Sequence, residues 1–121
     1  MHILLIDDEI HVIENLNLYL TSRNHTCTEL TRTSTIQHLH HYLTQNQPEC
    51  VILDFGMIPG GDVIYGWIKS WRSSTRVIFY TNYSDSTAEH ARMLNAGASP
   101  DEIIAKREVG SDVDRILRVL S

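Results

Sequence analysis

The sequence predicts an α/β domain in which a doubly wound, five-stranded parallel sheet carries helices on both faces. Five short apolar runs alternate strictly with five segments whose apolar residues recur at helical spacing. The stronger runs are apolar at every position, which is typical of parallel strands that are buried on both faces. Because parallel strands connect by right-handed crossovers, few topologies remain.

The first two strand–helix pairs are predicted before Pro48. His2–Ile6 is an apolar run too short for a helix, and Ile10–Tyr19 has helical periodicity. A weaker strand is expected at Cys27–Leu30. Hydroxyl residues at 33–35 are expected to cap the second helix. Its apolar residues are Ile36, Leu39, Tyr42 and Leu43.

The third pair begins with the strand Cys50–Leu53, which is followed by the loop FGMIPGGD. Asp62, the last residue of that loop, is predicted to be the N-cap of the third helix. We interpret Trp67 and Trp71, four residues apart in this helix, as packing residues.

The fourth pair consists of a strand at Arg76–Tyr80 and a helix that ends at Gly97. Ser86 and Glu89 are expected to form a capping box at the start of this helix. The fifth pair is a short strand at Ile103–Ala105 and a helix at Gly110–Leu120.

Composition excludes several classes of protein. With 42% hydrophobic and 21% charged residues, the 121-residue chain fits a globular protein, and residues 1–121 are predicted to form one domain. A formal net charge of −5 argues against direct nucleic-acid binding. No apolar run approaches the roughly 18 residues of a membrane span. Cys27 and Cys50 have no zinc-site spacing, so we expect a cytoplasmic protein.

Polar side chains follow four of the five predicted strands, and in an open α/β sheet ligands bind at that edge. Each alone has an ordinary explanation as a turn former, helix cap or solvated surface residue. Together they favour a functional acidic pocket. They are Asp7, Asp8, Glu9, Asp54, Thr81, Asn82 and Lys106.

The chemistry of this set points to phosphoryl transfer. Crowding of Asp7, Asp8 and Asp54 would raise the pKa of at least one carboxyl group unless a cation is bound. Oxygen ligands with few protein groups suit Mg²⁺. An Asp oxygen can act as nucleophile, while Lys106 and the metal offset charge on the transferred group and Thr81 bonds one of its oxygens.

On these residues the chain resembles the receiver domains of two-component response regulators over essentially its whole length. The resemblance rests on the Asp7–Asp8 pair, Asp54 after CVIL, Thr81 after RVIFY and Lys106 after EIIA. It implies a flavodoxin-like fold with strand order 2-1-3-4-5, and a signalling module rather than a turnover enzyme.

The resemblance also implies roles and partners. Asp54 would be the phosphoacceptor, and Thr81 and Lys106 would be the switch hydroxyl and the phosphate-binding lysine. The ligands of Mg²⁺ would be Asp8, Asp54, the Gly56 carbonyl and, through a bound water, Asp7. The partners would be a histidine kinase and an output domain or partner protein, with a homodimer possible on phosphorylation.

The chain departs from the usual receiver pattern at several positions. Ile58 stands where Pro is usual, and Pro59 follows it. Asn82 is larger than the usual Ala or Gly, and Ile103 replaces an aromatic residue. Arg107 replaces the Pro that commonly follows the lysine.

Three other classes of protein fit the sequence less well. A small Mg²⁺-dependent phosphatase or phosphotransferase of the haloacid-dehalogenase type needs Asp-x-Asp, but the chain has Asp7 and Glu9 at that spacing. A flavodoxin-like cofactor carrier would not place acids where a phosphate must bind. A receiver-like module that takes no phosphate is disfavoured by the intact Asp, Thr and Lys set. We interpret the His38, His40 and His41 cluster as a solvated helix face, not a metal site.

Overall fold

A computed structural model describes residues 1–121 and confirms the predicted fold class. Five parallel strands form one sheet in the order β2-β1-β3-β4-β5. The strands are β1 (His2–Ile6), β2 (Thr26–Leu30), β3 (Cys50–Leu53), β4 (Arg76–Thr81) and β5 (Ile103–Ala105). The helices are α1 (Ile10–Thr21), α2 (Ile36–Asn46), α3 (Gly61–Trp71), α4 (Thr87–Ala96) and α5 (Val109–Leu120). A short 3₁₀ turn at Pro100–Glu102, not predicted, precedes β5.

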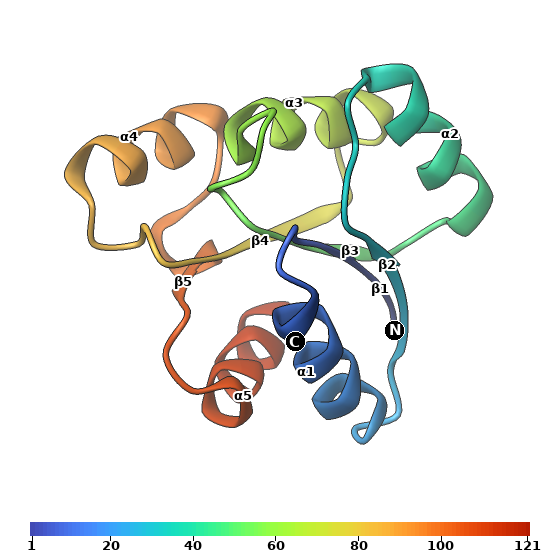
Figure 1. The fold of residues 1–121 in the computed structure, drawn as a ribbon, viewed down its shortest axis with the longest axis vertical. Helices are drawn as coiled ribbons and strands as arrows, with labels where there is room; N and C mark the ends of the chain where they lie inside the picture. The colour runs from blue at the N-terminus through green and yellow to red at the C-terminus, as the bar shows by residue number, and fades with distance from the viewer.

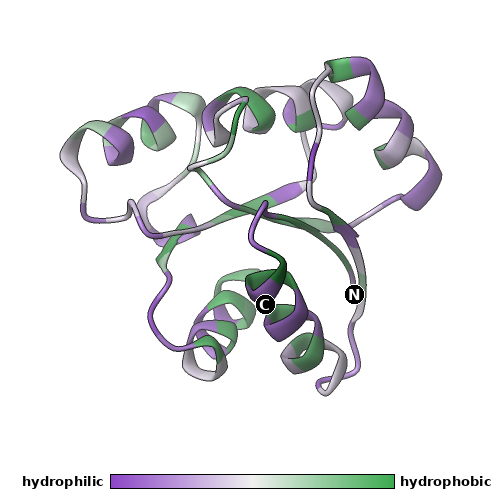
Figure 2. Ribbon diagram, viewed as in Figure 1, coloured by the Kyte–Doolittle hydropathy of each residue, from purple (hydrophilic) through white to green (hydrophobic).

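The helices cover both faces of the sheet, with α1 and α5 on one face and α2, α3 and α4 on the other (Figure 1). Successive strand side chains enter different cores because they point to opposite faces. Leu4 and Ile6 belong to the core beneath α2, α3 and α4, whereas Ile3 and Leu5 belong to the core beneath α1 and α5. Figure 2 shows the strands as largely hydrophobic segments between the two helical layers.

Two predictions about helix caps were wrong, although Ser86 does mark the start of α4 as predicted. Gly60, not Asp62, is the N-cap of α3, and Asp62 lies in its first turn. Its carboxylate instead forms an ion pair with Arg92 of α4 at 3.1 Å. Ser86 is the N-cap of α4, but its hydroxyl bonds the Glu89 carboxylate, so the reciprocal main-chain bonds of a capping box do not form.

Other predictions about the helices are confirmed. Thr35 caps α2 by accepting a hydrogen bond from the His38 amide at 3.1 Å. Trp67 and Trp71 are half-buried and pack against the core beneath α2, α3 and α4. His40 Nε2 bonds the Trp67 carbonyl oxygen at 2.8 Å, which links α2 to α3.

None of the helices is long and apolar enough to cross a membrane. The longest helices, α1 and α5, have 12 residues each.

Candidate functional site

The main chain brings the polar residues that follow the strands to one edge of the sheet. Ile6 pairs with Leu53, and the ladder continues one bond further, where the Asp54 amide donates to the Ile6 carbonyl at 2.9 Å. At the other side of the sheet, the Lys106 amide donates to the Thr81 carbonyl at 3.0 Å. The positions of these residues are therefore set by the same hydrogen-bond ladder that holds the strands.

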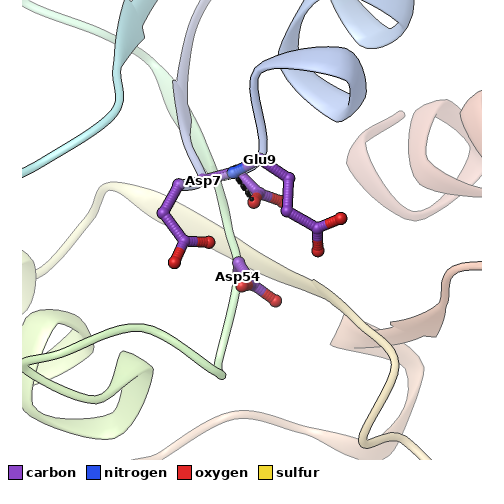
Figure 3. A group of neighbouring side chains, drawn as sticks. Asp7, Glu9 and Asp54 are labelled. Atoms are coloured by element: carbon purple, nitrogen blue, oxygen red, sulfur yellow. Dashed lines mark hydrogen bonds between the residues drawn. The ribbon is translucent and has the colours of Figure 1, made fainter.

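Four carboxylates form a cluster at this edge. Asp7, Asp8, Glu9 and Asp54 each place a carboxylate oxygen within 4.8 Å of the others. Asp7 and Asp54 are buried, at 3% and 6% exposed, while Asp8 and Glu9 are exposed. Figure 3 shows Asp7 and Glu9 on the loop after β1 and Asp54 at the end of β3, with the Glu9 amide donating to Asp7 at 2.9 Å.

Lys106 is the cation at the centre of the cluster. Its Nζ lies 2.8 Å from Asp7, 3.4 Å from Asp54 and 3.4 Å from Glu9, and its side chain is only 9% exposed. Four carboxylates and one ammonium group leave an excess of three negative charges when all are ionised. The donor set is entirely oxygen, so it fits a hard divalent cation such as Mg²⁺.

Burial is the main influence on the two inner carboxyl groups. Burial raises the pKa of Asp7 and of Asp54 above the usual 3.8, although the Lys106 ammonium opposes the shift at both. Repulsion from Asp8 also raises the pKa of Asp54, but less. The predicted direction is confirmed, whereas the predicted cause, mutual repulsion, is secondary to desolvation. Burial alone would lower the pKa of Lys106, but the surrounding carboxylates outweigh it and raise the pKa.

Thr81 ends β4 and is completely buried. Its hydroxyl oxygen accepts a hydrogen bond from the Tyr83 amide at 3.1 Å. The Tyr83 ring packs edge-on against Phe55, with ring centroids 6.1 Å apart. The loop after β4 therefore lies against the loop that carries Asp54.

The start of α3 approaches the Asp54 main chain very closely. A Cβ atom on Gly61 would lie 2.6 Å from Phe55 Cα and 2.7 Å from the Asp54 carbonyl oxygen. Only glycine fits between these backbone atoms. The loop from Asp54 to Gly60 is thus held at both ends.

The structure places the predicted residues as follows. Asp7, Asp8, Asp54 and Lys106 come together, and Thr81 lies on the adjoining strand end. Gly56 and Asp8 line the same open pocket of about 630 Å³, whose rim includes Ile58, at 98% exposed. Glu9 has no predicted role among the strand-end acids, yet its carboxylate lies 3.4 Å from Lys106 Nζ.

Comparison with known proteins agrees with this geometry. Residues 3–117 match the family model of the response regulator receiver domain. A search of curated protein sequences finds no match.

Solved structures share the fold. A CheY-like receiver domain protein from Methanospirillum hungatei superposes with a TM-score of 0.80 at 18% identity, covering 98% of this chain and 92% of that one. A response regulator from Thermotoga maritima gives 0.80 at 14% identity, covering 98% and 96%. RcsB from Salmonella enterica serovar Typhimurium, bound to a promoter with the phosphomimetic BeF₃⁻, gives 0.80 at 19% identity, covering 100% and 68%.

Proposed function

The chain belongs to the response regulator receiver domains, which are signalling modules rather than enzymes, and on that premise we propose that Asp54 accepts a phosphoryl group from a histidine kinase. The observation that carries the proposal is the Lys106 ammonium, which contacts both Asp7 and Asp54 at the end of a buried strand pair. A nucleophilic carboxylate beside a fixed cation is the arrangement that phosphoryl transfer to Asp requires.

The transfer step involves Asp54 and a phosphohistidine. An Asp54 carboxylate oxygen attacks phosphorus, the phosphorus–nitrogen bond breaks, and the electron pair stays on the imidazole, which then takes a proton. Lys106 stabilises the negative charge on the phosphoryl oxygens. The Thr81 hydroxyl would turn from the Tyr83 amide to one of these oxygens.

A divalent cation completes the proposed site. Asp8, Asp54 and the Gly56 carbonyl would hold Mg²⁺, with Asp7 contributing through a water. Bound there, the ion would offset charge on the phosphoryl group. The all-oxygen donor set and its excess negative charge support this assignment.

Receiver domains interact with histidine kinases and output domains. We propose the same partners for this chain: a histidine kinase as donor, and an output domain or a partner protein, including a second copy of the chain, as the reader of the phosphorylated state.

Mass spectrometry after incubation with acetyl phosphate tests the proposal. The wild-type protein should gain the mass of one phosphoryl group in the presence of Mg²⁺ and much less without it. Asp54→Asn should gain none, whereas Asp85→Asn, which removes an exposed carboxylate from the loop after β4, should be labelled normally. Full labelling of Asp54→Asn would show that the acceptor is a different residue.

A further inference from the structure

A third buried carboxylate, Asp112, lies on the opposite face of the sheet from α3 and α4. Asp112, in the first turn of α5, is completely buried, and Tyr80 of β4 is 4% exposed. The Tyr80 hydroxyl donates to Asp112 Oδ2 at 2.5 Å. Burying a carboxylate in an apolar core is costly unless it is paired and hydrogen-bonded, so the partners of Asp112 are informative.

Asp112 and Arg115 bind the main chain on both sides of Lys106. The Arg107 amide donates to Asp112 Oδ2 at 2.9 Å. Arg115 Nη2 donates to Asp112 Oδ1 at 2.6 Å and to the Ala105 carbonyl at 3.3 Å. The residues immediately before and after Lys106 are therefore both bonded to one ion pair in α5.

Tyr80 itself touches the same lysine. The Lys106 Nζ lies 6.0 Å from the centroid of the Tyr80 ring, at the outer limit of a cation–π contact. The residue after Tyr80 is Thr81, whose carbonyl accepts the Lys106 amide. Tyr80 thus lies between the buried carboxylate and the lysine of the acidic cluster.

The carboxylate stays ionised in this setting. Burial by itself raises the pKa of Asp112, but the hydrogen bonds from Tyr80, Arg107 and Arg115 together bring the pKa below the usual 3.8. An ionised Asp112 keeps Arg115 and the Arg107 amide bound, whereas a neutral one would lose much of its hold on both.

We propose that Tyr80, Asp112 and Arg115 form a positioning cluster that fixes the Lys106 main chain, and thereby the distance of the Lys106 ammonium from Asp54. The inference rests on the proposed function, since it assigns the purpose of the cluster to phosphoryl transfer. It adds three residues, all outside the acidic edge, to those on which that transfer depends. It also gives α5 a direct connection to Lys106, so a movement of this lysine toward a phosphoryl group would pull on the first turn of α5.

Tyr80→Phe tests the cluster because it removes only the hydroxyl and keeps the ring beside Lys106. Ile13→Val is the matched control, since Ile13 is buried in the same core beneath α1 and α5 and its side chain carries no polar group that could hydrogen-bond the cluster. Two quantities are measured in each variant: the rate of labelling by acetyl phosphate, and amide hydrogen exchange at Arg107 without phosphodonor. The rise in melting temperature with Mg²⁺ is also recorded. It should not change, because Lys106 is not among the proposed Mg²⁺ ligands.

In Tyr80→Phe we expect labelling to slow by about tenfold and Arg107 exchange to quicken by a similar factor, as for the loss of a hydrogen bond to a charged group. The Mg²⁺-induced rise should be unchanged, and Ile13→Val should alter neither rate beyond its general loss of stability. Normal labelling of Tyr80→Phe, or unchanged exchange at Arg107, would overturn the inference while leaving Asp54 as acceptor. If the wild-type protein takes no phosphate, the proposed function fails, and the exchange measurement alone decides whether the cluster holds the main chain at Lys106.

Discussion

Replacing Asp8 by Asn should stabilise the protein in the absence of divalent cations and reduce the stabilisation that Mg²⁺ provides. Asp8 is the exposed carboxylate among the proposed metal ligands, and one of its oxygens lies within 4.8 Å of an oxygen of each of three other carboxylates. The substitution is nearly isosteric, so it removes a negative charge with little change in packing. Repulsion falls, and one proposed ligand for the cation is weakened.

The size of the effect follows from the separation of the charges. Two like charges 4.8 Å apart repel by about 1 kcal/mol in water and about 3.5 kcal/mol at the effective dielectric of a protein surface. Asp8 is exposed, so the lower value applies to each pair, and part of the gain is offset by the lost attraction to Lys106. A net gain of about 1 kcal/mol corresponds to a rise in melting temperature of roughly 4 °C for a domain of this size.

The stabilisation of the folded protein by Mg²⁺ can be estimated in the same way. A tenfold excess of the ion over its dissociation constant stabilises the wild-type protein by about 1.4 kcal/mol, and Asp8→Asn should lose most of that increment at the same concentration. Thermal melts of both proteins, with and without MgCl₂ at matched ionic strength, measure the four values. Glu14→Gln, which removes an exposed charge from α1, is the control for net charge and should behave as wild type.

The reasoning is refuted if Asp8→Asn melts at the wild-type temperature without Mg²⁺ and gains as much as the wild type when the ion is added. In that case either the carboxylates do not repel measurably in the folded protein, or the ion binds elsewhere.

Three further predictions concern pH, α3 and the signal. Because the pKa values of Asp7 and Asp54 are raised in the folded state, the folded protein binds these protons more tightly than the unfolded chain. This contribution to stability is lost as pH rises from 3.8 through the raised values. In melts without Mg²⁺, the wild type should therefore gain more stability than Asp54→Asn as pH falls from about 7.5 towards 3.8, and parallel pH profiles would contradict this. In α3, Gly61→Ala should lower the free energy of unfolding by about 1–3 kcal/mol, because the added Cβ meets backbone atoms. Gly66→Ala, whose Cβ would have nothing within 4 Å, should raise the free energy of unfolding by about 0.5–1 kcal/mol. Denaturant unfolding measures both, and equal effects would be inconsistent with the close approach at Gly61. Beryllofluoride with Mg²⁺ should change hydrogen exchange in residues 82–97, β5 and α5, and a change confined to the loop after Asp54 would show that Thr81 and Lys106 do not transmit the signal.

The fold was predictable because the strands are short, apolar and regularly spaced. The carboxyl-edge position of Asp7, Asp54 and Lys106 followed from strand ends alone, since parallel strands in register place their next residues together. Helix starts were less predictable. Asp62 is a good N-cap by residue type, but the approach of Gly61 to the Asp54 backbone places the N-cap of α3 two residues earlier, at Gly60.

The Tyr80–Asp112 contact could not be predicted from local patterns. The two residues are 32 positions apart, and a polar residue near a helix start is normally solvated. The only sequence signal is a tyrosine at the end of an otherwise apolar run, whose hydroxyl needs a partner when buried. The relative effects of burial and repulsion on the pKa of Asp54 could not be predicted from the sequence either, because they depend on how deeply the strand end is buried in the folded protein.

Main-chain hydrogen bonds extend the ladder past the strand ends, so the positions of Asp54 and Lys106 do not depend on the chemistry of their side chains. Asp54 and Lys106 hold their places through main-chain atoms, and any amino acid other than proline would offer the same amide at those positions. The acids and the lysine at this edge of the sheet could consequently be replaced by other residues without a change of fold. The positioning cluster lacks this freedom, because its hold on the lysine main chain runs through the Asp112 carboxylate and the Arg115 guanidinium. We therefore expect evolutionary changes of reactivity to occur first among the side chains at this edge of the sheet, and to leave Tyr80, Asp112 and Arg115 unchanged.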